Sequence, residues 1–137
     1  KKTAPRAAGI PYATKGGLPL NVIFYEKDDG TVPAREFIYS LDEKLRAKIA
    51  RAIFLLQEKG HRLRTPESKE LTDGIMELRA SFGGNTARVL YFFIVGNTAV
   101  LTNGFIKKTQ LTPRREIERA KQYRTDYLRR YNHGYMG

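Results

Sequence analysis

Four basic residues occupy places where strand-like stretches would bring their side chains together. Arg79 lies in the alternating stretch IMELRA, with Glu77 on the same predicted face. Arg88 begins the next apolar run, and Lys107 and Lys108 end the last one. In an antiparallel meander these places are neighbours, so the four cations would converge on one surface. Because crowded like charges repel, a bound anion would stabilise the group, and we expect a phosphate-binding cleft there.

The distribution of charge extends beyond these four residues. The chain of 137 residues has a net charge of +11. Residues 1–20 carry four basic and no acidic residues, and residues 107–137 carry nine basic and three acidic ones. An excess of positive charge at both ends favours a polyanionic partner, most simply nucleic acid. The alternative is an ordinary solvated surface, on which Arg79 forms an ion pair with Glu77 or Glu70.

The composition limits the class of protein. Apolar residues make up 41% of the chain, including seven Phe and eight Tyr, and this length is typical of one domain. Cysteine is absent, which excludes disulfides and Cys-based zinc sites and fits the cytoplasm. We expect no membrane span and no secretory signal, because no apolar run is long enough. No cluster of His or acidic residues suggests a metal or another cofactor.

Periodicity and turn residues predict the elements that would position the basic residues. Strands are expected over residues 21–25, 75–80, 86–95 and 98–106, and helices are expected to start at Pro33, at Ser40 and at Thr112–Pro113. Ser40 and Glu43 have the spacing of a capping box, and Gly60 fits the end of that second helix. The order β-α-α-β-β-β-α predicts an α+β fold: a small antiparallel sheet with a helical hairpin and a C-terminal helix on one face. The other face is expected to stay open.

The sequence predicts one domain with two extensions. Residues 1–20 are rich in Gly, Pro and Ala and show no periodicity, so we expect a flexible basic arm. Residues 21–131 hold all the predicted elements. Residues 132–137 are expected to form a short tail.

Three motifs occur in order with specific gaps. They are Glu-Leu-Arg at 77–79, Arg-x-x-Tyr-Phe at 88–92 and Gly-Phe-x-Lys-Lys-Thr-x-x-Thr-Pro at 104–113. Over about residues 21–130 the chain resembles the HigB-like, phage Gp49-like branch of the RelE/ParE toxin superfamily. The resemblance implies a RelE-like fold and a toxin of a type II toxin–antitoxin module. Many members cut messenger RNA in the ribosomal A site without a metal. A cognate antitoxin, often a HigA-like helix-turn-helix protein, neutralises them.

The chemistry implied by the resemblance suits the cations. RNA is cleaved when its 2′-OH attacks the adjacent phosphorus, so an enzyme must align the strand and stabilise charge on the phosphoryl oxygens. Arg79 and Arg88 can do the second task as bidentate donors, and Lys107 or Lys108 as a point charge. A lysine among other cations can also have a lowered pKa, so either lysine is a candidate for moving a proton.

The identity of the general base stays open at this point. Glu77 is a candidate base, or equally a partner that orients a cation. Tyr91 is a candidate for stacking on a base or hydrogen bonding to a phosphate, although a packed aromatic of the sheet explains it as well. His61 and His133 lie outside the matching motifs, and we expect both on the surface.

A separate group of cations lies in the predicted C-terminal helix. Arg114 and Arg115 fall in its first turn, where positive charge opposes the helix dipole by a few tenths of a kcal/mol, and Arg119 follows one turn later. We expect these three residues to bind RNA of the ribosome. Two alternatives to a ribosome-dependent nuclease remain: a ParE-like, non-enzymatic inhibitor of DNA gyrase, and a non-toxic basic module of phage origin that binds nucleic acid or protein.

Overall fold

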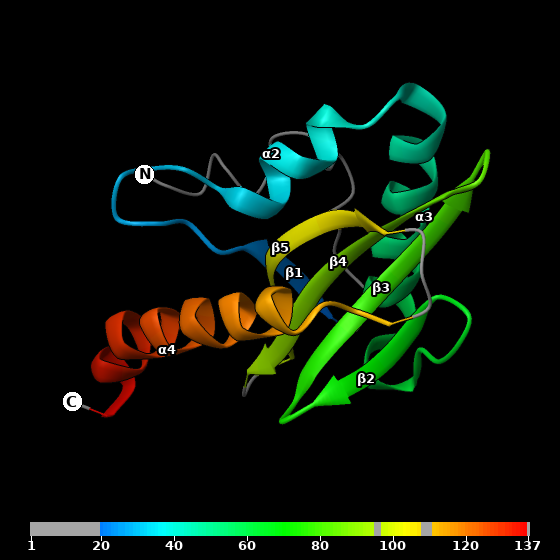
Figure 1. The fold of residues 1–137 in the computed structure, drawn as a ribbon. Coiled ribbons are helices and arrows are strands. Elements are labelled where there is room, and N and C mark those ends of the chain that lie inside the picture. The colour runs from blue at the N-terminus through cyan, green and yellow to red at the C-terminus, as the bar shows by residue number, and fades with distance from the viewer. Residues whose placement is uncertain (1–19, 95–96, 108–110, 137) are drawn as a thin grey trace.

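The computed structural model describes residues 20–94, 97–107 and 111–136. Its elements, in chain order, are β1 (Asn21–Phe24), α2 (Pro33–Ser40), α3 (Glu43–Lys59), the 3-10 turn η1 (Gly60–Arg62), β2 (Ser68–Thr72), β3 (Ile75–Phe82), β4 (Asn85–Ile94), β5 (Thr98–Lys107) and α4 (Arg114–Met136). The strands form one sheet between helices, which confirms the predicted α+β class (Figure 1). Lys108 and the predicted N-terminal arm before residue 20 lie outside the described residues.

The sheet has five strands in the order β1-β5-β4-β3-β2. Strands β2 to β5 are antiparallel, but β1 runs parallel to β5, with Asn21 opposite Thr98. The prediction of a purely antiparallel sheet was therefore wrong at this edge. The connection through α2 and α3 leads from β1 to β2 at the far edge of the sheet. Three antiparallel reversals then bring β5 beside β1, and β5 runs in the same direction as β1.

Strand β2 was not predicted, because its sequence SKELT is polar and only Ser68 is buried. It forms the edge next to β3. Asp73 and Gly74 join the two strands, with φ values of 51° and 79°. Two successive residues with positive φ match the type I′ turn of tight hairpins. Gly83 and Gly84 form the same kind of turn between β3 and β4, with φ values of 62° and 84°, at the predicted turn.

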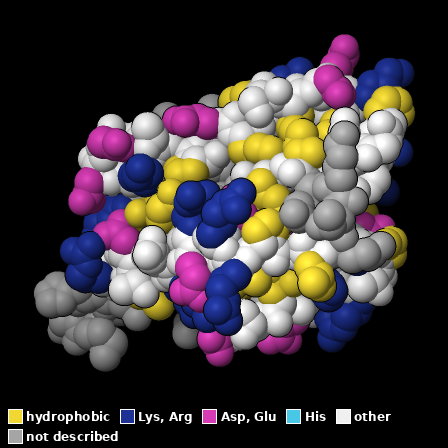
Figure 2. All heavy atoms as spheres, viewed as in Figure 1, with side chains coloured by type: hydrophobic (Ala, Val, Ile, Leu, Met, Phe, Trp, Pro, Cys, Tyr) yellow, Lys and Arg dark blue, Asp and Glu magenta, His cyan; other side chains and the backbone are white. Residues whose placement is uncertain are grey.

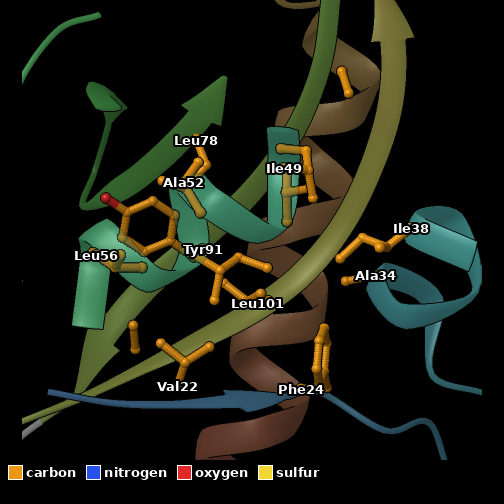
Figure 3. Packing of buried hydrophobic residues seen from close by; sticks show 14 of the residues in the cluster. Val22, Phe24, Ala34, Ile38, Ile49, Ala52, Leu56, Leu78, Tyr91 and Leu101 are labelled. Atoms are coloured by element: carbon orange, nitrogen blue, oxygen red, sulfur yellow. The ribbon is translucent and has the colours of Figure 1, made fainter. Parts of the chain in front are cut away.

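Helices α2 and α3 cover one face of the sheet and enclose the larger core. Figure 3 shows the side chains that meet there, which include Val22, Phe24, Ile38, Ile49, Leu56, Leu78, Tyr91 and Leu101. On α2, the Phe37 ring packs directly on Gly104 of β5, where an added Cβ would lie 2.3 Å from a ring carbon. This close contact explains why a residue without a side chain occupies the middle of a strand.

The start of α3 differs from the predicted capping box. The N-cap is Asp42, whose Oδ1 accepts a hydrogen bond from the Leu45 amide at 2.9 Å. The Ser40 hydroxyl instead donates to the Phe37 carbonyl at the end of α2, at 2.6 Å. Gly60 is the C-cap of α3, as predicted, with a φ of 59°.

Helix α4 lies across the opposite face of the sheet (Figure 1). Its side chains pack on Leu90, Phe92 and Val100 and include Ala120, Tyr123, Tyr127 and Leu128. The expectation of an open face was wrong, because β4 and β5 carry apolar side chains on both faces and both need cover. The helix continues to Met136, into the stretch that was expected to be a tail.

The second half of α4 is fixed to the end of β1 by a polar cluster. The Tyr25 hydroxyl donates to Asp126 Oδ2 at 2.6 Å, and Arg130 donates to the same carboxylate at 2.6 Å. Arg130 also donates to the Glu26 carbonyl. Burial raises the pKa of Tyr25 to about 12, and the Arg130 hydrogen bond lowers the pKa of Asp126. These contacts hold the second half of α4 beside the end of β1.

A bulge in β5 decides which of its side chains face α4. Leu90 lies opposite Asn103 and Tyr91 lies opposite Leu101, so Thr102 is the extra residue. The Thr102 hydroxyl donates to the Leu90 carbonyl at 3.1 Å. Because a bulge reverses the alternation beyond it, Asn103 contacts α4 even though Leu101, two residues earlier, faces α3.

Candidate phosphate-binding site

Two of the predicted cations are cross-strand neighbours. Arg79 of β3 lies directly opposite Arg88 of β4 in the antiparallel register. Directly opposed residues of an antiparallel pair project from the same face, with Cβ atoms about 5 Å apart. The backbone of Lys107 pairs with Thr86, two residues from Arg88 along β4. Three of the four predicted positions thus lie at the same end of three adjacent strands.

A buried ion pair joins Arg88 to Glu77. One terminal nitrogen of Arg88 lies 2.8 Å from Glu77 Oε2, and the two residues are only 5% and 1% exposed. The Thr112 hydroxyl donates to the other carboxylate oxygen, Glu77 Oε1, at 2.8 Å. Arg88 also donates to the Thr112 oxygen at 3.4 Å. Both oxygens of Glu77 therefore have donors, as a buried carboxylate requires.

This pairing corrects two expectations. Glu77 pairs with Arg88 and not with Arg79, because Arg88 sits diagonally across the strands from it, two residue pairs beyond Leu90. Arg88 also does not lie on an open face: Thr112, just before α4, contacts its guanidinium group. The segment that enters α4 thereby fixes the position of Arg88.

Arg79 differs from Arg88 in both burial and partners. Its side chain is half-buried. Its Nε atom is buried and has no hydrogen-bond partner among the described residues. A buried donor without a partner costs free energy, and an anion bound beside the guanidinium group would remove that cost. Unlike Arg88, Arg79 thus forms no ion pair with a carboxylate of the described residues.

A second polar cluster holds the first turn of α4 on β5. Asn103 donates from Nδ2 to Glu116 Oε1 at 3.1 Å and to the Glu116 carbonyl at 3.3 Å. Arg119 forms an ion pair with the same carboxylate at 3.1 Å. Sequence reasoning missed Asn103 and Glu116, and it assigned Thr112 only to a helix cap. The Thr-Pro at the end of the third motif was the signal available for Thr112.

The cations of α4 that were predicted to bind RNA are on the surface. Arg114 and Arg115 are exposed, and Arg119 is exposed although it pairs with Glu116. Figure 2 shows basic side chains, mixed with acidic ones, along this helix. Arg114 and Arg115 therefore follow closely after Thr112, which contacts the ion pair, but both side chains are exposed.

Tyr91 belongs to the core on the other face of the sheet. Its ring lies among the residues beneath α3 (Figure 3) and is 1% exposed. Its hydroxyl and that of Ser68 are 2.6 Å apart and share a hydrogen bond. Burial raises the pKa of Tyr91 to about 12. Of its two predicted roles, this placement favours the packed aromatic and brings Tyr91 into no contact with Arg79 or Arg88.

Within the described parts of the chain, no group of three or more His, Cys, Asp or Glu side chains could hold a metal ion. Of the helices that the structure describes, none is both long and apolar enough to cross a membrane.

The fold and the ordered motifs define a small α+β domain with a buried Glu–Arg pair beside a half-buried arginine. The family model described as Phage derived protein Gp49-like (DUF891) matches residues 36–125. The chain belongs to this family, which is the HigB/RelE-like branch of toxins. The match spans Glu77, Arg79, Arg88 and Thr112. The family points to the toxin of a toxin–antitoxin module. A comparison with curated proteins found no match.

Proposed function

We propose that the protein is a ribosome-dependent endoribonuclease that cleaves messenger RNA without a metal and thereby inhibits translation. The observation that supports this most directly is the cross-strand pair Arg79–Arg88, with Glu77 fixing one of the two guanidinium groups. A protein that acted only by binding another protein would have no need to place two arginines side by side. The family supports the toxin class to which this activity belongs.

In the proposed reaction the RNA 2′-OH attacks the adjacent phosphorus and the 5′-oxygen leaves. Negative charge increases on the non-bridging oxygens, where positioned guanidinium groups stabilise the transition state. Arg79 binds the phosphate, and Arg88 is held in place by Glu77 and Thr112. Because both oxygens of Glu77 already accept hydrogen bonds, we assign it to positioning and not to proton removal. Lys107 and Lys108 are our candidates for moving the proton.

The partners in this proposal are the ribosome with its message and a cognate antitoxin. Arg114, Arg115 and Arg119 would bind ribosomal RNA, because they are exposed cations next to the site. The antitoxin would be a HigA-like helix-turn-helix protein encoded beside this chain. Its expected effect is to abolish growth inhibition and to form a stable complex on co-expression.

The test is primer extension on a message carried by purified ribosomes. We expect cuts within the ribosome-bound codon for the wild-type protein and for Arg62→Gln, an exposed cation outside the site. Arg79→Gln should cut at least about a hundredfold more slowly, as when one donor to a transition-state oxyanion is removed. Cleavage should persist when transition metals are chelated and Mg²⁺ is kept at the level that the ribosome needs.

Other results of these assays would favour a different function. An intact message together with inhibited DNA supercoiling would favour the gyrase inhibitor. If translation and supercoiling both continue, the chain is a non-toxic binding module. Cleavage that is lost on chelation and restored by Mn²⁺ would show that a metal takes part.

A further inference from the structure

A basic groove lies between α3 and the β3–β4 hairpin. Two adjoining cavities of about 530 and 520 Å³ form it, and both are lined by Lys48 and Arg51. Each cavity falls within the size range of ligand pockets, about 300–1,000 Å³. The first also reaches Arg79, and the second ends at Phe82. Residues of the proposed phosphate site, Arg79 and Arg88, thus line one part of the groove, and Phe82 at the tip of the hairpin lines the other.

The cations of α3 form a stripe along this groove. Lys44, Lys48 and Arg51 have the spacing i, i+4 and i+7, which places them on one face over about 10 Å of helix. None of the three forms an ion pair with a described residue. The acidic residues lining the two cavities are Glu43 and Glu67. The groove thus has an excess of positive charge, even when Arg88 is counted as neutralised by Glu77.

An exposed aromatic ring stands at the end of the stripe. Phe82 is 43% exposed, and Lys44 Nζ lies 5.9 Å from the centre of its ring. Phe82 precedes the Gly83–Gly84 turn, and neither glycine covers the ring with a side chain. Figure 1 shows the hairpin tip reaching toward the start of α3, and Figure 2 shows basic and hydrophobic side chains together in that region, at the upper right.

We propose that this groove binds single-stranded RNA next to the scissile phosphate. Phe82 would stack on one base, while Lys44, Lys48 and Arg51 would follow the backbone toward Arg79. A row of cations that ends at an aromatic face suits single-stranded nucleic acid, because every base offers a π-face and every nucleotide a negative charge. The proposal rests on the proposed function for the identity of the strand, which would be the message on the ribosome.

The first test measures binding without cleavage. The probe is a labelled twelve-nucleotide RNA with 2′-O-methyl groups, which cannot react, and its anisotropy is followed over a range of salt concentrations. We expect Lys48→Gln/Arg51→Gln to bind about tenfold more weakly and to reduce the slope of log K against log salt by about 1.4, as for two lost contacts to a single strand. The matched control is Lys59→Gln/Arg62→Gln, with the same loss of charge outside the groove. It should keep the wild-type slope.

The aromatic ring is tested separately from charge. Phe82→Leu should weaken binding about tenfold at an unchanged salt slope, while Phe82→Tyr should bind like the wild type, because stacking needs a ring. Circular dichroism of each variant checks that the hairpin is folded. If Leu and Tyr at this position bind equally well, stacking on Phe82 is excluded. If the two charge doubles lose the same affinity and slope, the groove has no specific role and the proposal fails.

The remaining outcomes distinguish this inference from the proposed function. If the RNA binds through the groove but no ribosome-bound message is cut, the nuclease assignment fails and the groove stands. If messages are cut and the Lys48/Arg51 double variant binds and cuts like the wild type, the groove fails and the nuclease stands. A labelled pentapeptide of four glutamates around one leucine serves as a competing probe. If the groove variants lose this peptide and keep the RNA, the groove belongs to an acidic protein partner.

Discussion

Replacing Glu77 by glutamine tests how much the buried Glu77–Arg88 ion pair contributes to the stability of the fold. The change keeps the shape of the side chain but leaves Arg88, a residue that is only 5% exposed, without its counter-charge. Removing one partner of a buried pair costs about 3–5 kcal/mol, because the remaining charge stays desolvated. Domains of this kind are stable by about 5–15 kcal/mol in total. The variant should therefore fold, but with a large part of its stability lost.

The assay is unfolding in urea followed by far-UV circular dichroism. With an m value of about 2 kcal/mol/M, this loss lowers the midpoint by about 1.5–2.5 M. Glu70→Gln is the matched control, because Glu70 is an exposed carboxylate on the neighbouring strand β2. Its midpoint should change by less than about 0.3 M, as is usual for surface substitutions.

The double variant Glu77→Gln/Arg88→Gln separates the charge effect from the loss of packing. With both charges removed, no unpaired ion remains, and most of the lost stability should return. A Glu77→Gln midpoint within about 0.5 M of the wild type, taking the same m value, would refute the reasoning. So would a double variant that is less stable than the single one, because the Arg88 charge would then not be the cause.

Three further predictions concern other parts of the chain. Gly104→Ala should cost about 1–3 kcal/mol in urea unfolding, because the added methyl group would lie 2.3 Å from the aromatic ring of α2; wild-type stability would contradict the packing. The Arg130 hydrogen bond lowers the pKa of Asp126, so this carboxylate stabilises the fold fully above its unfolded pKa of about 3.9 and progressively less below it. Thermal unfolding should accordingly show that the wild type is more stable than Asp126→Asn near pH 5, and that this difference in stability shrinks as the pH falls toward about 3. A difference that grew on acidification would show that the lowered pKa of Asp126 is not its cause. Arg114→Gln/Arg115→Gln should weaken co-sedimentation with ribosomes and flatten its salt dependence, with the cleavage rate at saturation unchanged; normal binding with slow cleavage would place both residues in the active site.

Local sequence patterns predicted the elements well where one residue type decides the backbone. The Gly83–Gly84 turn and the Gly60 helix end are examples, because positive φ strongly favours glycine. The Asp73–Gly74 turn carried an equally strong signal. It was missed because the polar strand β2 before it shows no apolar alternation. At α3, Asp42 and Ser40 are both good N-cap residues, and only the fold shows which one accepts the bond.

The residues of the candidate site could be predicted from the sequence, but the pairs that they form could not. Arg79 and Arg88 were expected to be neighbours, and their register makes them so. The pairing of Glu77 with Arg88 depends on strand register, on the position of Thr112 and on a helix that covers the face. The bulge at Thr102, which turns Asn103 toward α4, has no sequence signal in this chain. These are long-range features, and a periodicity within one element carries no information about them.

The parallel pairing of β1 with β5 has a consequence for the order of folding. β1 is the first described strand and sits at an edge, and its one neighbour in the sheet is the last strand. Asn21 and Thr98, which lie opposite each other, are more than seventy residues apart in the chain. During synthesis β1 therefore cannot pair in the sheet until β5 has left the ribosome. Until then Val22 and Phe24 cannot reach their buried positions in the core. Contacts so distant in sequence form slowly, since the intervening loop must close first. The translating ribosome must thus release the chain through the end of β5 at Lys107 before a complete sheet can exist.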